Sequence, residues 1–155
     1  MFFAWKDNMA IDGGLIDSDH QELIAIMDGV MILLHNKAPK AAILTMLDGL
    51  ANFARIHFER EEALQKAAGY PDAPNHKQIH VTLLKDLEDY IREMSNISCS
   101  ALTPQECKNR MHEAKRFMTR WLIAHILGED VKLRPHVQKM SPVADSMPNL
   151  LQQGV

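Results

Sequence analysis

The sequence predicts an all-α protein, an antiparallel up-down-up-down four-helix bundle. Apolar residues recur at helical spacing through four long segments, only short breaks separate these segments, and the strict alternation typical of strands is nearly absent. Helices joined by short loops run antiparallel to their neighbours. At 155 residues, the chain is long enough to bury the core of one domain without cross-links.

The first two helices have recognisable boundaries. The first is expected to begin with Asp17 or Ser18 as its N-cap, after an irregular arm formed by residues 1–17. The second is expected to run from about residue 40 to residue 68. Gly69 then stands where a glycine commonly ends a helix.

The third and fourth helices are marked by prolines. The third is expected to open near Pro74, since proline suits the first turn of a helix. Residues 103–106 read Thr-Pro-Gln-Glu, a capping box that starts the fourth helix. Pro135 is expected to end that helix, so residues 1–134 form the domain and residues 135–155 a loosely ordered tail.

The composition argues against several classes of protein. The formal net charge of −3 gives no basic surface for nucleic acid or acidic lipid. The two cysteines form no CxxC motif, which speaks against a disulfide framework or a thiolate zinc site. No segment is apolar and long enough to cross a membrane, and the N-terminus lacks the pattern of a signal peptide. We therefore expect a cytoplasmic protein that binds neither nucleic acid nor membrane.

Histidine is the unusual residue type, with eight copies that are not scattered. His35, His112 and His136 have no paired ligand, and we interpret them as surface residues. The other histidines lie on apolar stripes, together with two carboxylates. Two pairs of these groups, at positions 57/61 and 76/80, are four residues apart, so both members of each pair project from one helical face. Because alternate helices run in opposite directions, all of these groups fall at the same end of the bundle and face inward. The candidate ligands are His20, His57, Glu61, His76, His80, His125 and Asp130.

These candidate ligands point to a metal centre only as a set. A lone histidine on an apolar stripe is more often a hydrogen-bonded core residue, and a histidine–carboxylate pair is often a surface contact. Five imidazoles and two carboxylates buried together without a metal would leave polar groups unpaired, each at a cost of roughly 1–3 kcal/mol. Seven ligands are too many for one tetrahedral zinc, whereas imidazole with carboxylate suits iron. If both carboxylates and one further oxygen bridge two octahedral irons, a single coordination position stays open.

The spacing of the last two ligands requires an irregular helix. Residues five apart in a regular α-helix, such as His125 and Asp130, point about 140° apart. For both to reach one site, we expect a widened, π-like turn near Gly128.

The pattern resembles the hemerythrins, particularly the bacterial single-domain members, over about residues 1–134. The matching segments read Asp-Ser-Asp-His at 17–20, His-Phe-Glu-Arg-Glu-Glu at 57–62, Gly-Tyr-Pro at 69–71, His-Lys-Gln-Ile-His at 76–80 and Trp-Leu-Ile-Ala-His-Ile at 121–126, followed by Asp130.

The resemblance implies two non-haem irons with unequal ligand sets. His76, His80 and His125 would hold one iron. His20 and His57 would hold the other, which has the open position. Glu61, Asp130 and an oxo or hydroxo group would bridge the two irons.

The resemblance also implies a function, which is reversible binding of dioxygen at the open iron. Phe58, Trp121, Leu122 and Ile126 match family positions that line the oxygen pocket, a role compatible with simple core packing. We expect an oxygen carrier, store or delivery protein rather than an enzyme. Ferritin-like oxidases use Glu-x-x-His pairs, and this sequence contains none.

The alternative is a sensor of oxygen, nitric oxide or redox state that acts through a partner protein. No output domain is attached, which weighs against this reading, and a partner contacting the tail at residues 135–155 would revive it.

Overall fold

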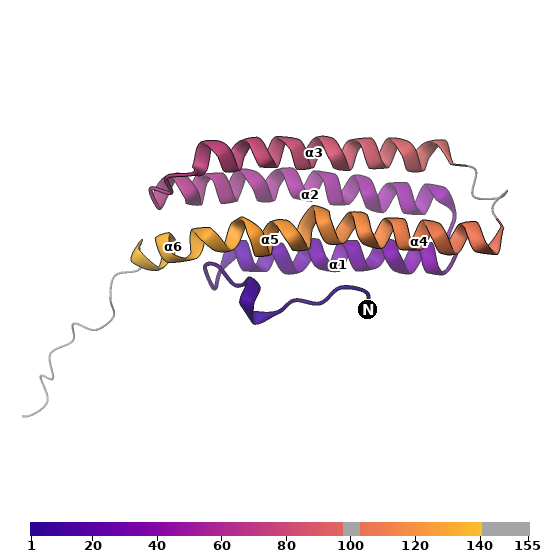
Figure 1. Cartoon of the computed structure of the whole chain (residues 1–155), viewed down its shortest axis with the longest axis horizontal. Coiled ribbons are helices and arrows are strands. Elements are labelled where there is room, and N and C mark those ends of the chain that lie inside the picture. The colour runs from indigo at the N-terminus through magenta and orange to yellow at the C-terminus, as the bar shows by residue number, and fades with distance from the viewer. Residues whose placement is uncertain (98–102, 141–155) are drawn as a thin grey trace, which may run out of the picture.

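The computed structural model describes residues 1–97 and 103–140, and within these ranges it contains helices and no strand. Three long helices, α1 (Leu15–His35), α2 (Lys40–Ala67) and α3 (Ala73–Asn96), lie side by side with a fourth column that begins as α4 (Pro104–Met118). Figure 1 shows the four columns aligned along the long axis of the molecule. The predicted all-α four-helix bundle is confirmed. None of the described helices is both long and apolar enough to span a lipid bilayer.

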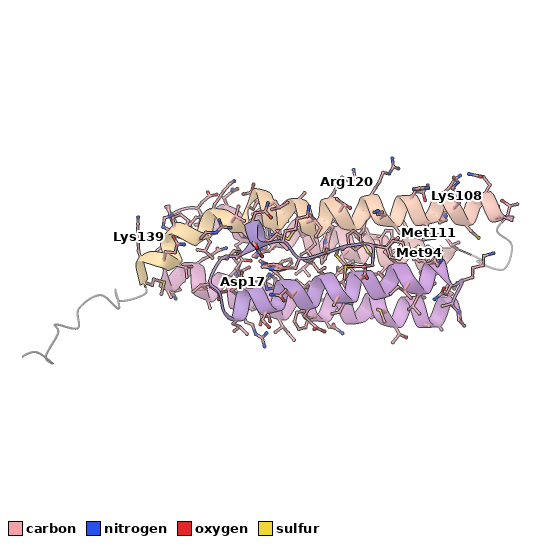
Figure 2. The ribbon with its side chains drawn as sticks, turned by 90° about the horizontal axis from the view of Figure 1, so that it is seen from below. Asp17, Met94, Lys108, Met111, Arg120 and Lys139 are labelled. Atoms are coloured by element: carbon pink, nitrogen blue, oxygen red, sulfur yellow. The ribbon has the colours of Figure 1, made fainter. Side chains whose placement is uncertain are left out.

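Helix α1 begins earlier than the sequence predicts. It starts at Leu15, and the backbone N–H groups of Ile16 and Asp17 donate to the Asp12 carboxylate at 3.1 and 3.2 Å. The predicted N-cap at Asp17 or Ser18 is therefore wrong, because the capping carboxylate comes from a residue further back in the arm. Asp17 is instead buried inside the first turn, near the end of the bundle where the arm joins α1 (Figure 2).

Two predicted helix boundaries are confirmed, the glycine that ends the second helix and the capping box that starts the fourth. Gly69 has a φ of +63°, the left-handed conformation that glycine adopts without strain after a helix. At the start of α4, the Glu106 N–H donates to the Thr103 hydroxyl at 3.3 Å, and the Thr103 N–H donates to the Glu106 carboxylate at 2.7 Å.

The fourth column continues past α4 as four short segments. A π-helix (η3, Thr119–Ile123) leads into α5 (Ala124–Gly128), a 3-10 turn (η4, Asp130–Leu133) and α6 (Arg134–Met140). Pro135 does not end the helical run. It lies in the first turn of α6, where its missing N–H needs no acceptor.

The prediction of a loosely ordered tail is therefore wrong for residues 135–140. The rest of that predicted tail, residues 141–155, lies outside the described residues.

Arg134 connects α6 to the N-terminal arm, which contains a short 3-10 turn (η1, Asp7–Met9). Its guanidinium donates to the Ala10 and Asn8 carbonyls at 2.6 and 2.8 Å. Residues 131–140 thus pack on the same end of the bundle as the arm.

Two apolar clusters fill the interior. The larger includes Leu23 of α1, Leu47 of α2 and Leu87 of α3, and runs through most of the bundle. The smaller forms around Ile16 and Leu133 near one end. On each helix, the candidate ligands stand in sequence between residues of the smaller cluster and residues of the larger one. The candidate site is therefore a polar layer between two apolar ones.

Candidate metal centre

All seven predicted ligands converge in one buried layer. Each of them is at most 5% exposed. Their donor atoms form two groups, in each of which one atom per residue lies within 4.8 Å of the others. Glu61 and Asp130 belong to both groups. The first group adds His76, His80 and His125, and the second adds His20 and His57.

The first group is built around His76 of α3. Its Nε2 lies 3.2 Å from Glu61 Oε1, 3.1 Å from Asp130 Oδ1 and 2.9 Å from His80 Nε2. His125 Nε2 lies 2.9 Å from Asp130 Oδ1. Several ring nitrogens and carboxylate oxygens therefore point at one small volume.

The second group faces the other oxygen atoms of the two carboxylates. His20 Nε2 lies 3.3 Å from Asp130 Oδ2, and His57 Nε2 lies 3.5 Å from Glu61 Oε2. Asp130 thus divides its two oxygens between the groups. This is the arrangement that a carboxylate shared by two metal ions requires.

The unpaired atoms of the cluster test whether metal ions fit. Among the described residues, ten buried side-chain nitrogens and oxygens make no hydrogen bond, and all but Gln65 Oε1 belong to the predicted ligands. Native proteins leave few buried polar atoms unpaired, because each costs about 1–3 kcal/mol. Imidazole nitrogens and carboxylate oxygens are ligands of divalent transition metals. The residues present therefore fit a dinuclear metal centre.

Two of the candidate ligands, His57 and Glu61, are already in the protonation state that a metal ion requires. Burial, together with the neighbouring His20, lowers the pKa of His57 to about 4 and keeps this imidazole neutral. Burial raises the pKa of Glu61, but the His76 and His80 rings beside its carboxylate outweigh burial and lower that pKa to about 2. For His76, burial lowers the pKa, but the Asp130 and Glu61 carboxylates, 3.1 and 3.2 Å from its Nε2, outweigh burial and raise the pKa to about 10. A bound metal would displace the His76 proton, since a ligating imidazole must be neutral.

The irregular turn that brings Asp130 to His125 is not where the sequence predicts it. The π-helix lies at Thr119–Ile123, before His125, rather than near Gly128. Between the two ligands, α5 ends with Glu129 at φ −116° and ψ −57°, and a 3-10 turn begins. The prediction of a widened turn near Gly128 is therefore wrong. The break at Glu129, followed by the tighter 3-10 turn, turns Asp130 toward His125 instead.

The four predicted pocket residues are all buried in the larger cluster, with exposures of 0–3%. The Phe58 ring stacks on His80 with ring centres 4.0 Å apart, and it lies 5.5 and 6.2 Å from the rings of His57 and His125. Trp121 is fixed to α3, because its Nε1–H donates to the Leu83 carbonyl at 2.8 Å. Leu122 and Ile126 are at most 1% exposed, which fits both pocket and core roles.

Sequence reasoning missed three polar side chains around the ligands. Gln65, fully buried on α2, donates to Glu61 Oε1 at 2.8 Å, and its position one turn after Glu61 was an available signal. The Glu62 and Asp19 carboxylates face the outer ring nitrogens of His80 and His57. Burial raises the pKa of Glu62, but hydrogen bonds from Lys77 and His80 outweigh it and lower that pKa.

Two of the three histidines interpreted as surface residues, His35 and His112, are exposed. His136 is half-buried, with its ring centre 5.2 Å from that of Tyr70. Its placement follows from α6, the helix that continues the fourth column past Pro135.

The bundle and its cluster define a class of protein, a four-helix bundle with a buried histidine–carboxylate centre for two metal ions. Residues 14–137 match the hemerythrin HHE cation binding domain. Because this match covers most of the chain, the chain belongs to the hemerythrin family, as the motifs predicted.

Curated relatives agree with this assignment. A bacteriohemerythrin of Stenotrophomonas maltophilia is 27% identical over 127 residues, which span 82% of this chain and 76% of that protein. A bacteriohemerythrin of Clostridium acetobutylicum is 26% identical over 132 residues, or 83% of this chain and 95% of that protein. A hemerythrin-like protein of Naegleria gruberi is 23% identical over 132 residues, or 85% of this chain and 91% of that protein.

Proposed function

We propose that this protein binds dioxygen reversibly at a non-haem di-iron centre, as an oxygen carrier, store or delivery protein. The observation that carries the proposal is the pair of ligand groups that share Glu61 and Asp130. Similarity to proteins named bacteriohemerythrin supports it.

The two groups supply unequal numbers of histidines. His76, His80 and His125 would hold one iron, and Glu61 and Asp130 would bridge it to the other. With only His20 and His57 besides the bridging carboxylates, the second iron would have fewer protein ligands and room for dioxygen. When bound, the two ferrous ions supply the electrons for dioxygen binding.

The surrounding side chains would favour release of dioxygen over its chemical conversion. The larger apolar cluster borders the ligands, and its buried side chains, including Phe58, Leu122 and Ile126, exclude water from that side. A site shielded from water loses bound reactive species less readily. We therefore propose binding rather than catalysis.

Stopped-flow mixing of the anaerobic, di-ferrous protein with dioxygen tests the proposal. We expect an absorption band that forms within the mixing experiment and disappears under argon, with full recovery over repeated cycles. The His112→Ala variant, which loses an exposed histidine, should behave as wild type. Continuous oxygen consumption in the presence of a reductant, without a reversible band, would show an oxidase or peroxidase instead.

A further inference from the structure

Two carboxylates that are not candidate ligands lie directly behind candidate ligands. One is Glu62 of α2, whose Oε1 lies 3.2 Å from His80 Nδ1. The side chain of Glu62 is only 23% exposed, so this contact is partly shielded from water. The other oxygen of the Glu62 carboxylate, Oε2, accepts a hydrogen bond from Lys77 Nζ at 2.8 Å.

The contact with Glu62 fixes which nitrogen of His80 carries the proton. An ionised carboxylate can only accept hydrogen bonds, so His80 Nδ1 must be the donor. In the neutral ring, Nε2 then has its lone pair free, and Nε2 is the atom that lies 2.9 Å from His76 Nε2 and 3.6 Å from Glu61 Oε2. The ring is thus oriented with its ligating atom toward the metal cluster.

We propose that Glu62 is a positioning residue of the metal centre, which holds the His80 ring in the metal-binding tautomer and is itself held by Lys77. This inference rests on the metal centre of the proposed function. Carboxylates behind ligating histidines fix the ring and make it a stronger donor, and their loss weakens metal binding about 10–100-fold.

The second ligand group has a looser version of the same arrangement. Asp19 Oδ2 lies 3.5 Å from His57 Nδ1, and the Asp19 carboxylate accepts hydrogen bonds from Arg60 at 2.8 and 3.1 Å. A separation of 3.5 Å is too long for a strong hydrogen bond. Each ligand group therefore has one histidine backed by a carboxylate and a basic residue, with the tighter contact in the three-histidine group.

The test compares Glu62→Gln with Glu59→Gln, which removes the same charge from an exposed position on the same helix. Each protein is loaded anaerobically with ferrous iron and titrated with a ferrous chelator. We expect Glu62→Gln to lose iron at roughly 10–100-fold lower chelator concentration, while Glu59→Gln matches wild type. The reduction potential of Glu62→Gln should also rise, because a lost negative charge near His80 destabilises ferric iron.

Lys77→Met provides a second variant that cannot disrupt the core, since the Lys77 side chain is 66% exposed. It should shift iron retention in the same direction as Glu62→Gln but less, and it should have no further effect when combined with Glu62→Gln. If Glu62→Gln fails to fold, Lys77→Met alone still tests the inference, and iron retention equal to wild type in that variant would overturn it.

The results separate this inference from the proposed function. If wild type and Glu59→Gln hold two irons and Glu62→Gln retains them equally well at the same potential, Glu62 is not a positioning residue. Equal effects of Lys77→Met with and without Glu62→Gln would also overturn the inference. If wild type itself fails to hold iron, the proposed function fails first.

Discussion

The buried imidazoles dominate the chemistry at the scale of single residues. His20, His57 and His76 have no exposed surface, and each has a ring nitrogen without a hydrogen bond. Any one of them could be a core histidine, but their convergence on shared carboxylates is not explained by packing. Metal binding explains both the burial and the unpaired atoms.

The sequence predicted the ligands well because they lie on apolar stripes, and helical periodicity places such residues inside the bundle. It did not identify Asp19 or Glu62. Each of these is next in sequence to a candidate ligand, but its contact depends on how neighbouring helices are rotated. Periodicity within one helix does not determine that rotation.

Leu122→Ala tests whether the apolar wall protects bound oxygen. Leu122 is 1% exposed, so the substitution should cost about 2–5 kcal/mol of stability. Iron content should stay unchanged, because Leu122 has no ligand atom, while the oxygenated form should autoxidise faster. The measurement is the decay of the oxygenated absorption band at matched pH.

The control for this substitution is Leu47→Ala, an equally buried leucine on α2. It lies ten residues from His57, about 15 Å along the helix, so it should lose stability without faster autoxidation. If both variants decay at the wild-type rate with intact iron, Leu122 is only a core residue.

Substitution of single histidines tests whether the seven candidate ligands form two groups, one for each iron. His57→Ala should weaken the iron that has two histidines, and His80→Ala should weaken the other. We expect each purified variant to hold about one iron per chain in metal analysis, with different spectra. Two tightly held irons in both variants would contradict the division into two ligand groups.

At the scale of elements, the sequence predicted long helices better than their irregular ends. The capping box at residues 103–106 is local, so it could be read directly. The start of α1 depends on Asp12 reaching across Gly13 and Gly14, and the π-helix interrupts the fourth column at Thr119–Ile123. Neither has a distinctive local pattern of residue types.

Asp12→Ala tests the revised start of α1. Loss of the carboxylate that accepts from Ile16 and Asp17 should lower the free energy of unfolding by about 1 kcal/mol. Ser18→Ala, at an exposed position that sequence rules favoured as the cap, should have little effect. Denaturant unfolding of both variants shows whether Asp12 or Ser18 caps the helix. A larger loss of stability in Ser18→Ala than in Asp12→Ala would support the predicted N-cap.

At the scale of the whole molecule, the candidate centre joins every column of the bundle. Its ligands come from α1, α2, α3 and the segments after η3, and they lie between two apolar clusters. The topology could be predicted because short loops force neighbouring helices to run antiparallel. The docking of α6 could not be predicted in this way. Pro135 was expected to end the fourth helix, but proline also suits the first turn of a new helix, which is where it lies.

The central claim is that these seven side chains form one centre for two irons. Metal analysis of the protein after anaerobic loading with ferrous iron and removal of unbound metal tests it most directly. We expect two irons per chain in wild type and loss of tight iron binding in an Asp130→Ala, Glu61→Ala double variant, which removes both shared carboxylates. One zinc per chain with no iron, even after anaerobic loading, would contradict the account.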